Sequence, residues 1–225
     1  MNLTVLYEDN HLIAVFKPAG VLTQKDKTNE ESLMEVVKEY LKEKYRKPGN
    51  VFLGMLHRLD RPVAGIVLFA KTSKGASRLS EQFRAHEVEK MYHAVVLGRL
   101  DKSKGRLVNY LRKNPSNNKV SVYNEVVPES GLAELYYETV ASNEKYSLLK
   151  IRLITGKSHQ IRAQFAFLGH PLLGDIKYGA PQRLNDKSIA LCATGLKFRL
   201  PTKDEEKEII IETPLNWKDY LEALQ

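Results

Sequence analysis

The chain has 225 residues, 43% hydrophobic and 28% charged, which is the composition of an ordinary globular protein with a sizeable core and excludes disordered and fibrous classes. Lysine and arginine number 35 against 27 aspartate and glutamate, and the resulting net charge of +8 favours polyanionic partners such as nucleic acid, although solvated surfaces often carry a similar excess. Cys192 is the only cysteine, which excludes an intrachain disulfide, and the absence of a long apolar run leads us to expect a cytoplasmic protein.

The first half of the chain predicts strands and helices in alternation. Runs of Val, Ile, Leu and aromatic residues favour strands, whereas apolar residues at helical spacing before a proline or glycine favour helices. The expected elements are a hairpin within 3–20 that turns at Glu8–Asn10, a helix within 28–50, a buried strand at 65–71, a helix at 72–88 and a strand at 90–98.

The second half predicts mainly antiparallel strands. Short strands alternate with turn sequences over residues 107–153, which favours a meander of neighbouring strands. A capped helix is expected over 158–168, because a polar turn precedes it and glycine and proline follow it. Two more strands are expected at 189–198 and 207–214, and a short helix at 216–224. No linker or repeat interrupts the pattern, so we expect one domain over residues 1–225.

The residues Gly156, Lys157 and Ser158 match the end of a phosphate-binding P-loop. That motif needs a glycine five residues before Gly156, and this position holds Ile151 within an apolar strand. The sequence therefore argues against a nucleotide-binding P-loop. A glycine-containing turn that enters a helix can still bind a phosphate of another ligand, because free N–H groups and the helix dipole favour anions.

The histidines and serines form no recognisable catalytic or metal-binding pattern. None of the six histidines has the H-E-x-x-H spacing, and a single cysteine cannot supply a cysteine pair. The G-x-S-x-G motif is absent, and the adjacent Ser158 and His159 are poorly placed to act as nucleophile and base. We therefore expect neither a metal site nor serine chemistry.

Asp60 stands between two arginines, in the segment His57-Arg58-Leu59-Asp60-Arg61, just before the apolar strand. Such a carboxylate can form a surface ion pair worth ~0.2–1 kcal/mol, organise a phosphate site or act as a catalytic group that is kept ionised. These residues alone leave the three alternatives open and slightly favour the ion pair.

Four segments together resemble the RluA family of pseudouridine synthases, in matching order and spacing. They are VFKPAGV (15–21), HRLDRPVAGIVLFAK (57–71), EKMYHAVVLG (89–98) and TGKSHQIRAQFAFLGHPLLGDIKYG (155–179). The resemblance implies an α+β catalytic domain with a bent, mixed and largely antiparallel sheet flanked by helices. It also implies isomerisation of uridine to pseudouridine in ribosomal or transfer RNA, by an enzyme that needs no cofactor or metal; nothing demands more than a monomer.

The resemblance assigns three residues to catalysis. Asp60 matches the catalytic aspartate, and Arg162 matches the arginine that would keep this carboxylate ionised by lowering its pKa. Tyr92 matches the tyrosine that packs on the flipped uracil, where a stacking ring would recover part of the cost of base flipping. A single carboxylate suits an isomerase better than a glycosidase, which needs two. Asp175 could be brought near as a second carboxylate, but it is interpreted as a turn residue.

Other residues are assigned to RNA binding. Arg58 resembles the arginine that enters the RNA stack when the target nucleotide leaves it, whereas Arg61 is expected to make a backbone or structural contact. Lys90 shares a strand face with Tyr92 by alternation and could contact a phosphate. The remaining residues assigned to substrate binding are His57, Gln160 and Ile161.

The sequence departs from the family pattern at two places. Relatives have a Thr-Ser pair shortly after the catalytic aspartate, whereas this chain has Pro62, Val63 and Ala64 there. Relatives also have a histidine at the position of Gln164. The first change raises a rival interpretation: a noncatalytic RNA-binding or RNA-remodelling protein that has kept the synthase fold. Retention of Asp60 together with the assigned tyrosine and arginine argues against this rival.

Overall fold

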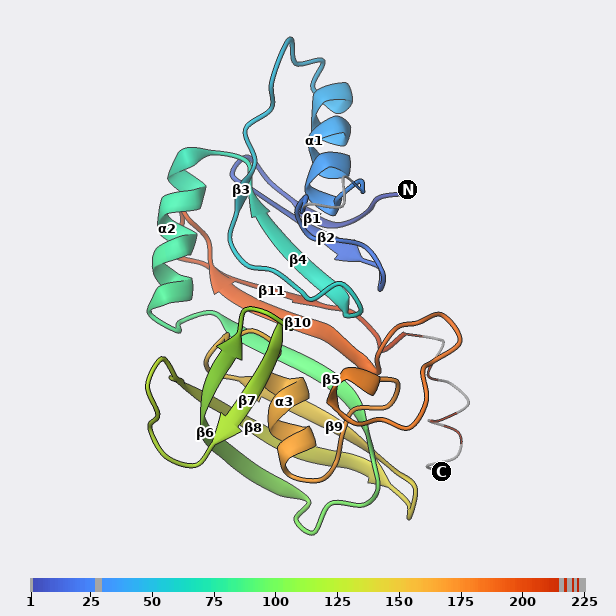
Figure 1. Cartoon of the computed structure of the whole chain (residues 1–225). Helices are drawn as coiled ribbons and strands as arrows, with labels where there is room; N and C mark the ends of the chain where they lie inside the picture. The colour runs from blue at the N-terminus through green and yellow to red at the C-terminus, as the bar shows by residue number, and fades with distance from the viewer. Residues whose placement is uncertain (1, 27–29, 215–216, 218–219, 221, 223–225) are drawn as a thin grey trace. The chain divides into compact units, whose positions relative to one another are not determined.

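The computed structural model describes residues 2–26, 30–214, 217, 220 and 222 (Figure 1). The chain divides into two compact units. The first unit comprises Met1–Val88 and Gly195–Ile211, and the second comprises Glu89–Thr194 and Glu212–Gln225. One strand therefore contributes to both units, because β10 (Leu191–Arg199) contains the boundary.

The first unit is built from short antiparallel ladders and two helices. Its elements are β1 (Thr4–Glu8), β2 (Leu12–Lys17), α1 (Leu33–Lys44), β3 (Gly54–Met55), β4 (Ala64–Ala70), α2 (Ser73–Arg84), the end of β10 and β11 (Glu206–Ile210). β2 pairs with β1 on one side and with β4 on the other, while β3 pairs with β4 and β11 with β10. The predicted hairpin, buried strand and two helices are thus confirmed.

Side-chain alternation explains how α2 packs in this unit. Leu12 and Leu68 project from β2 and β4 into an apolar cluster that Leu79 of α2 completes, and all three are fully buried. Burial of each such side chain stabilises the fold by ~1.5–3 kcal/mol. Thr72 caps α2 by accepting a hydrogen bond from the Gly75 N–H, as the sequence predicts.

The second unit contains a five-stranded antiparallel array covered by one helix. Its elements are β5 (Glu89–Leu97), β6 (Lys104–Asn114), β7 (Lys119–Tyr123), β8 (Gly131–Ser142), β9 (Tyr146–Leu153), α3 (Gln160–Phe167), the 3₁₀ helix η1 (Ile176–Tyr178) and the start of β10. The strand order is β5-β9-β8-β6-β7. The predicted meander is therefore wrong in one respect: β8 pairs with the free edge of the long β6 and not with the short β7 that precedes it.

α3 begins two residues later than predicted. His159, at the N-cap, has a left-handed backbone with φ 52° and makes no side-chain cap, so the expectation of a capped helix from Ser158 is wrong. The helix packs on β6 and β7 through an apolar cluster that includes Leu111, Val120 and Ala163. Residues 160–165 are all buried, although half of them are polar.

The ladders described above are antiparallel and the helices are interspersed along the chain, which confirms the predicted α+β class. The predicted strands at 189–198 and 207–214 correspond to β10 and β11. The helix expected at 216–224 lies largely outside the described residues. Among the described residues, no helix is long and apolar enough to cross a membrane.

Candidate active site

Asp60 lies in a loop of the first unit that leads into β4, and backbone hydrogen bonds fix this loop against the turn after β2. The Arg61 carbonyl accepts a bond of 2.7 Å from the Gly20 N–H, and the Arg61 Nε donates back to the Gly20 carbonyl over 2.9 Å. The Val63 N–H donates to the Asp60 carbonyl over 3.0 Å. The loop conformation is therefore set on both sides of Asp60.

Thr23 fixes the residue before Asp60. Its buried hydroxyl donates to the Leu59 carbonyl over 2.9 Å and accepts from the Leu59 N–H over 3.3 Å. One side chain thus satisfies both backbone groups of a buried residue that has no strand neighbour of its own. Because Leu59 is held in this way, Asp60 starts from a fixed backbone position.

Lys17, at the end of β2, is fully buried and electrostatically coupled to Asp60. Its ammonium donates to three carbonyls, those of Pro18 (3.0 Å), Val21 (2.7 Å) and Arg61 (3.2 Å). Burial lowers the pKa of Lys17 to about 7, while the charge of Asp60 acts to raise it. Through the Arg61 carbonyl, Lys17 joins the end of β2 to the loop that contains Asp60.

The neighbours of Asp60 in sequence have separate environments. Arg61 pairs with Glu30 through both terminal nitrogens in an exposed fork, which agrees with its predicted structural contact. Arg58 is exposed. His57 stacks on Phe83 at 5.1 Å, and its Nε2 accepts a hydrogen bond from the Leu68 N–H. The assignments of Arg58 and His57 to RNA binding stay predictions.

The tripeptide that departs from the family pattern is accommodated by packing. Val63 and Ala64 are buried, with 2% and 7% of their surface exposed. The turn from Asp60 to Val63 is closed by the backbone hydrogen bond between these two residues, without a side-chain hydroxyl. Loss of the Thr-Ser pair therefore leaves the backbone at Asp60 ordered.

In the second unit, Arg162 forms a buried two-bond ion pair with Asp175. Its Nε and a terminal nitrogen donate to the two carboxylate oxygens over 2.6 and 2.9 Å, and the side chains are 6% and 1% exposed. Asp175 does begin η1, but the interpretation as a turn residue missed this pairing. The fork fixes the plane of the guanidinium group.

Tyr178 supports the same arginine from another side. The Arg162 guanidinium lies 5.1 Å from the centre of the Tyr178 ring, and the Tyr178 hydroxyl bonds to His159 Nδ1 over 2.8 Å. The hydroxyl also accepts from the Val120 N–H of β7 over 2.9 Å. Tyr178 therefore joins η1, β7 and the start of α3 around Arg162.

Tyr92 and Lys90 share the buried face of β5, as predicted by alternation. Tyr92 is 8% exposed. Lys90 is equally buried and donates to the Ile154 carbonyl over 3.1 Å, and burial lowers its pKa. Stacking of Tyr92 on uracil and a phosphate contact by Lys90 stay predictions.

The remaining predicted residues lie in α3. The Gln160 Oε1 accepts from the Thr155 hydroxyl and from the Lys157 N–H, and its Nε2 donates to the Glu134 carbonyl. Ile161 is 4% exposed. Gln160 thus orders the turn that enters α3, and its assignment to substrate binding stays a prediction.

Gln164, the second departure from the family pattern, is also integrated into the fold. Its Nε2 donates to Asn109 Oδ1 over 2.8 Å and, more weakly, to the Ala133 carbonyl. The residue is 1% exposed, so the amide occupies the space between α3 and the sheet.

The structure brings together Asp60 and Lys17 in the first unit, and Arg162, Asp175 and Tyr178 in the second. Because Asp60 and Arg162 belong to different units, their pairing stays a prediction. The sequence interpretation missed Lys17, Asp175 and Tyr178 as site residues, although all three lie in the segments VFKPAGV and GDIKYG of the resemblance. Among the described residues, no three His, Cys, Asp or Glu side chains gather in a metal-binding group.

The pattern that defines the RNA pseudouridylate synthase family matches residues 11–167, which is more than half of the chain and includes Asp60, Tyr92 and Arg162. The chain belongs to this family. Its fold agrees, because it superimposes on human RNA pseudouridylate synthase domain containing 4 with a TM-score of 0.81, over 98% of this chain and 92% of that one, at 23% identity.

Curated relatives in bacteria are closer in sequence. The chain is 32% identical to tRNA pseudouridine synthase C of Vibrio cholerae over 88% of its own length and 86% of that protein. It is also 32% identical to ribosomal large subunit pseudouridine synthase C of Vibrio parahaemolyticus, over 91% of this chain and 64% of that protein. The family match and the curated relatives thus confirm the predicted activity, isomerisation by an RNA pseudouridine synthase, and no comparison favours the noncatalytic rival.

Proposed function

We propose that the chain isomerises uridine in structured RNA, ribosomal or transfer, with Asp60 as the catalytic carboxylate. The observation that carries the proposal is the fixed loop around Asp60, within the segment that matches the family. Leu59, Asp60 and Arg61 are each held through backbone groups, and the fully buried Lys17 bonds to the Arg61 carbonyl next to Asp60. Such preorganisation is what a catalytic group requires.

The reaction needs an ionised carboxylate. The N1–C1′ bond of the nucleotide breaks, the uracil turns, a C5–C1′ bond forms, and the proton lost from C5 is balanced by one gained at N1. Asp60 can assist by attacking C1′ or by accepting the 2′ proton, and either role requires the negative charge. By family analogy, Arg162 would favour that charge electrostatically.

The other assigned residues have supporting roles in this proposal. Arg162 would act with its orientation set by Asp175 and Tyr178, and Tyr92 would pack on the flipped uracil. Arg58 is exposed, as a side chain that replaces an extruded nucleotide must be. The two units would form one catalytic domain, since the family match runs through both of them. We further propose that the enzyme acts in the cytoplasm as a monomer.

The test is Asp60→Asn, which removes the charge and keeps the size of the side chain. We expect pseudouridine formation to be abolished, while the affinity for RNA and the melting temperature stay close to those of the wild type. Pseudouridine mapping in total cellular RNA, with and without the gene, would identify the substrate RNA to use in this assay. Turnover near that of the wild type would contradict the assignment of Asp60.

Lys145→Ala is a suitable control for the same assay. Lys145 is exposed in the turn between β8 and β9, so its removal changes the protein charge without touching the assigned residues. We expect this variant to keep full activity. If Asp60→Asn and Lys145→Ala lose activity to the same extent, Asp60 has no special role.

A further inference from the structure

An open pocket of about 350 Å³ lies in the second unit, between the β6–β7 hairpin, the turn before β8 and the turn that enters α3. Leu111 and Val120, both buried in the cluster beneath α3, provide apolar lining. Lys113, Lys157 and Ser158 provide polar lining. Ligand sites commonly combine an apolar lining with a few convergent polar groups, in volumes of about 300–1,000 Å³.

The pocket is positively charged. Lys113 and Lys157 have no ion-pair partner within the described part of the chain. One carboxylate, that of the exposed Glu129, also lines the pocket, so two lysines against one glutamate leave one net positive charge. The two ammonium groups are therefore available to an anion.

The side chain of Lys157 extends closely over Gly131. A Cβ atom added to Gly131 would lie 3.0 Å from Lys157 Nζ and 3.1 Å from its Cε. A side chain at position 131 would therefore crowd the lysine, which would have to shift by a few tenths of an ångström. The Lys157 N–H also donates to Gln160 Oε1 over 3.1 Å, which fixes the backbone from which the side chain extends.

The opposite wall of the pocket is anchored as well. The Tyr178 hydroxyl accepts from the Val120 N–H over 2.9 Å, and Lys177 Nζ reaches the Asn117 carbonyl at 3.3 Å. Both bonds tie the β6–β7 hairpin to η1. Lys113, on β6, is therefore presented from a fixed hairpin.

We propose that this pocket binds a backbone phosphate of the RNA substrate, at a nucleotide other than the uridine that is isomerised. The identity of the ligand as RNA rests on the proposed function. Two lysines can neutralise the phosphate, and the Ser158 hydroxyl can donate a hydrogen bond to it. None of Asp60, Tyr92 and Arg162 lines the pocket, so the proposed contact does not use these three residues.

The test is the double variant Lys113→Ala/Lys157→Ala, made in the Asp60→Asn background so that RNA is bound but not converted. Affinity for a single-stranded oligouridylate is measured over a series of salt concentrations. Loss of one phosphate contact reduces the slope of log affinity against log salt by ~0.7 and weakens binding. The matched control, Lys145→Ala, also removes a lysine from the second unit but leaves the pocket intact, and its slope should stay unchanged.

A second measurement separates binding from chemistry. In the otherwise wild-type chain, the double variant should raise the RNA concentration for half-maximal pseudouridine formation and leave the maximal rate unchanged. A slope equal to that of Lys145→Ala would overturn the proposal. So would binding of inorganic phosphate that depends on the two lysines while RNA binding does not, because the ligand would then be free phosphate.

These outcomes are distinct from a failure of the proposed function. If the wild type forms no pseudouridine, the catalytic proposal fails, but the slope comparison still tests whether the pocket contacts RNA. If the wild type is active and the double variant has an unchanged slope, only the pocket assignment fails.

Discussion

Lys17 has an environment that is unusual for its residue type. Lysine is seldom fully buried, yet Lys17 has no exposed surface and directs its ammonium at three carbonyls. One of these belongs to Arg61, so the lysine ties the turn after β2 to the loop that contains Asp60. The site thus places a desolvated amine against the loop that carries the carboxylate of the proposed reaction.

The lowered pKa of Lys17 predicts a pH dependence of stability. Its pKa is about 7 in the folded chain and ~10.4 when unfolded, so between these values the unfolded state binds more protons. The free energy of unfolding therefore gains up to ~1.4 kcal/mol per pH unit from this residue as pH rises from about 7 to 10. Below pH 7 the contribution is constant.

Denaturant unfolding at several pH values checks this expectation with Lys17→Met. The free energy of unfolding of the wild type, minus that of the variant, should increase from pH 7 to pH 10. Lys145→Ala, which removes an exposed lysine, should show no such trend relative to the wild type. A constant difference for Lys17→Met over this range would mean that Lys17 titrates like an exposed lysine.

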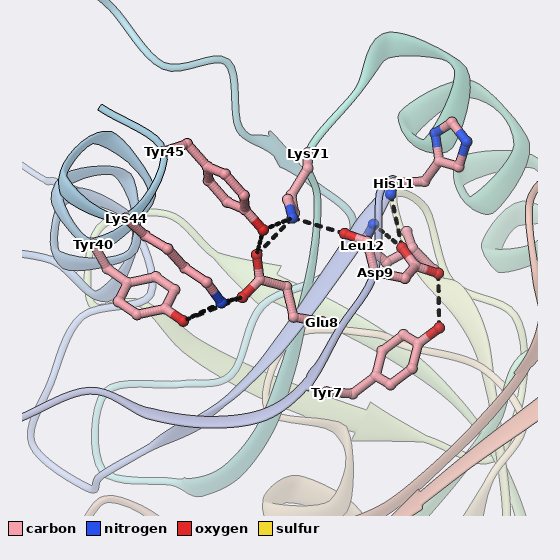
Figure 2. Close-up of polar contacts among 9 residues, drawn as sticks. All are labelled: Tyr7, Glu8, Asp9, His11, Leu12, Tyr40, Lys44, Tyr45 and Lys71. Carbon is pink, nitrogen blue, oxygen red and sulfur yellow. Dashed lines mark hydrogen bonds and ion pairs between the residues drawn. The ribbon is translucent and has the colours of Figure 1, made fainter. Parts of the chain in front are cut away.

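At the scale of elements, Glu8 connects α1 to the strands of the first unit (Figure 2). Lys44 and Tyr45, at the end of α1, and Lys71, at the end of β4, each donate to the Glu8 carboxylate over 2.6 Å. The side chains of Glu8 and Lys71 are 9% and 8% exposed. Burial raises the pKa of Glu8, but these donors outweigh burial and hold the pKa at about 2.

Replacement Glu8→Gln should destabilise the chain at neutral pH by about 1–3 kcal/mol, because the buried Lys71 loses its charged acceptor. Since the folded pKa lies below the unfolded value, this stabilisation is present above pH ~4.5 and disappears as pH falls toward 2. The free energies of unfolding of the wild type and the variant should therefore converge at acid pH. The control is Glu39→Gln, which alters an exposed residue of α1 and should change the free energy of unfolding only slightly. Equal effects of the two variants would contradict the role of Glu8.

At the scale of the molecule, the net charge of +8 is consistent with binding to RNA. We predict that the logarithm of RNA affinity falls linearly with the logarithm of salt concentration, with a slope of ~0.7 for each phosphate contacted on a single strand. Fluorescence anisotropy with Asp60→Asn would measure the slope without turnover. A flat response would exclude binding dominated by phosphate contacts.

Much of the local structure follows directly from the sequence. The apolar run of β4 is buried at every position, and Ser32 forms the capping box with Glu35 at the start of α1, just where the apolar spacing begins. The boundary of α3 was less predictable, because histidine adopts the left-handed conformation of His159 more often than most residues but still rarely. The pairing of β8 with β6 also depends on which strand edge remains free, and spacing along the chain does not determine that.

The sequence by itself determined the class, most of the elements and, through the four quoted segments, the family and the candidate Asp60, Tyr92 and Arg162. These depend on local periodicity and on residue order. Only the tertiary structure decided that Asp175 pairs with Arg162, and that Lys17 loses its solvent and reaches Arg61, 44 residues away. Desolvation and long-range hydrogen bonds arise when distant segments pack, so they appear only in the folded chain.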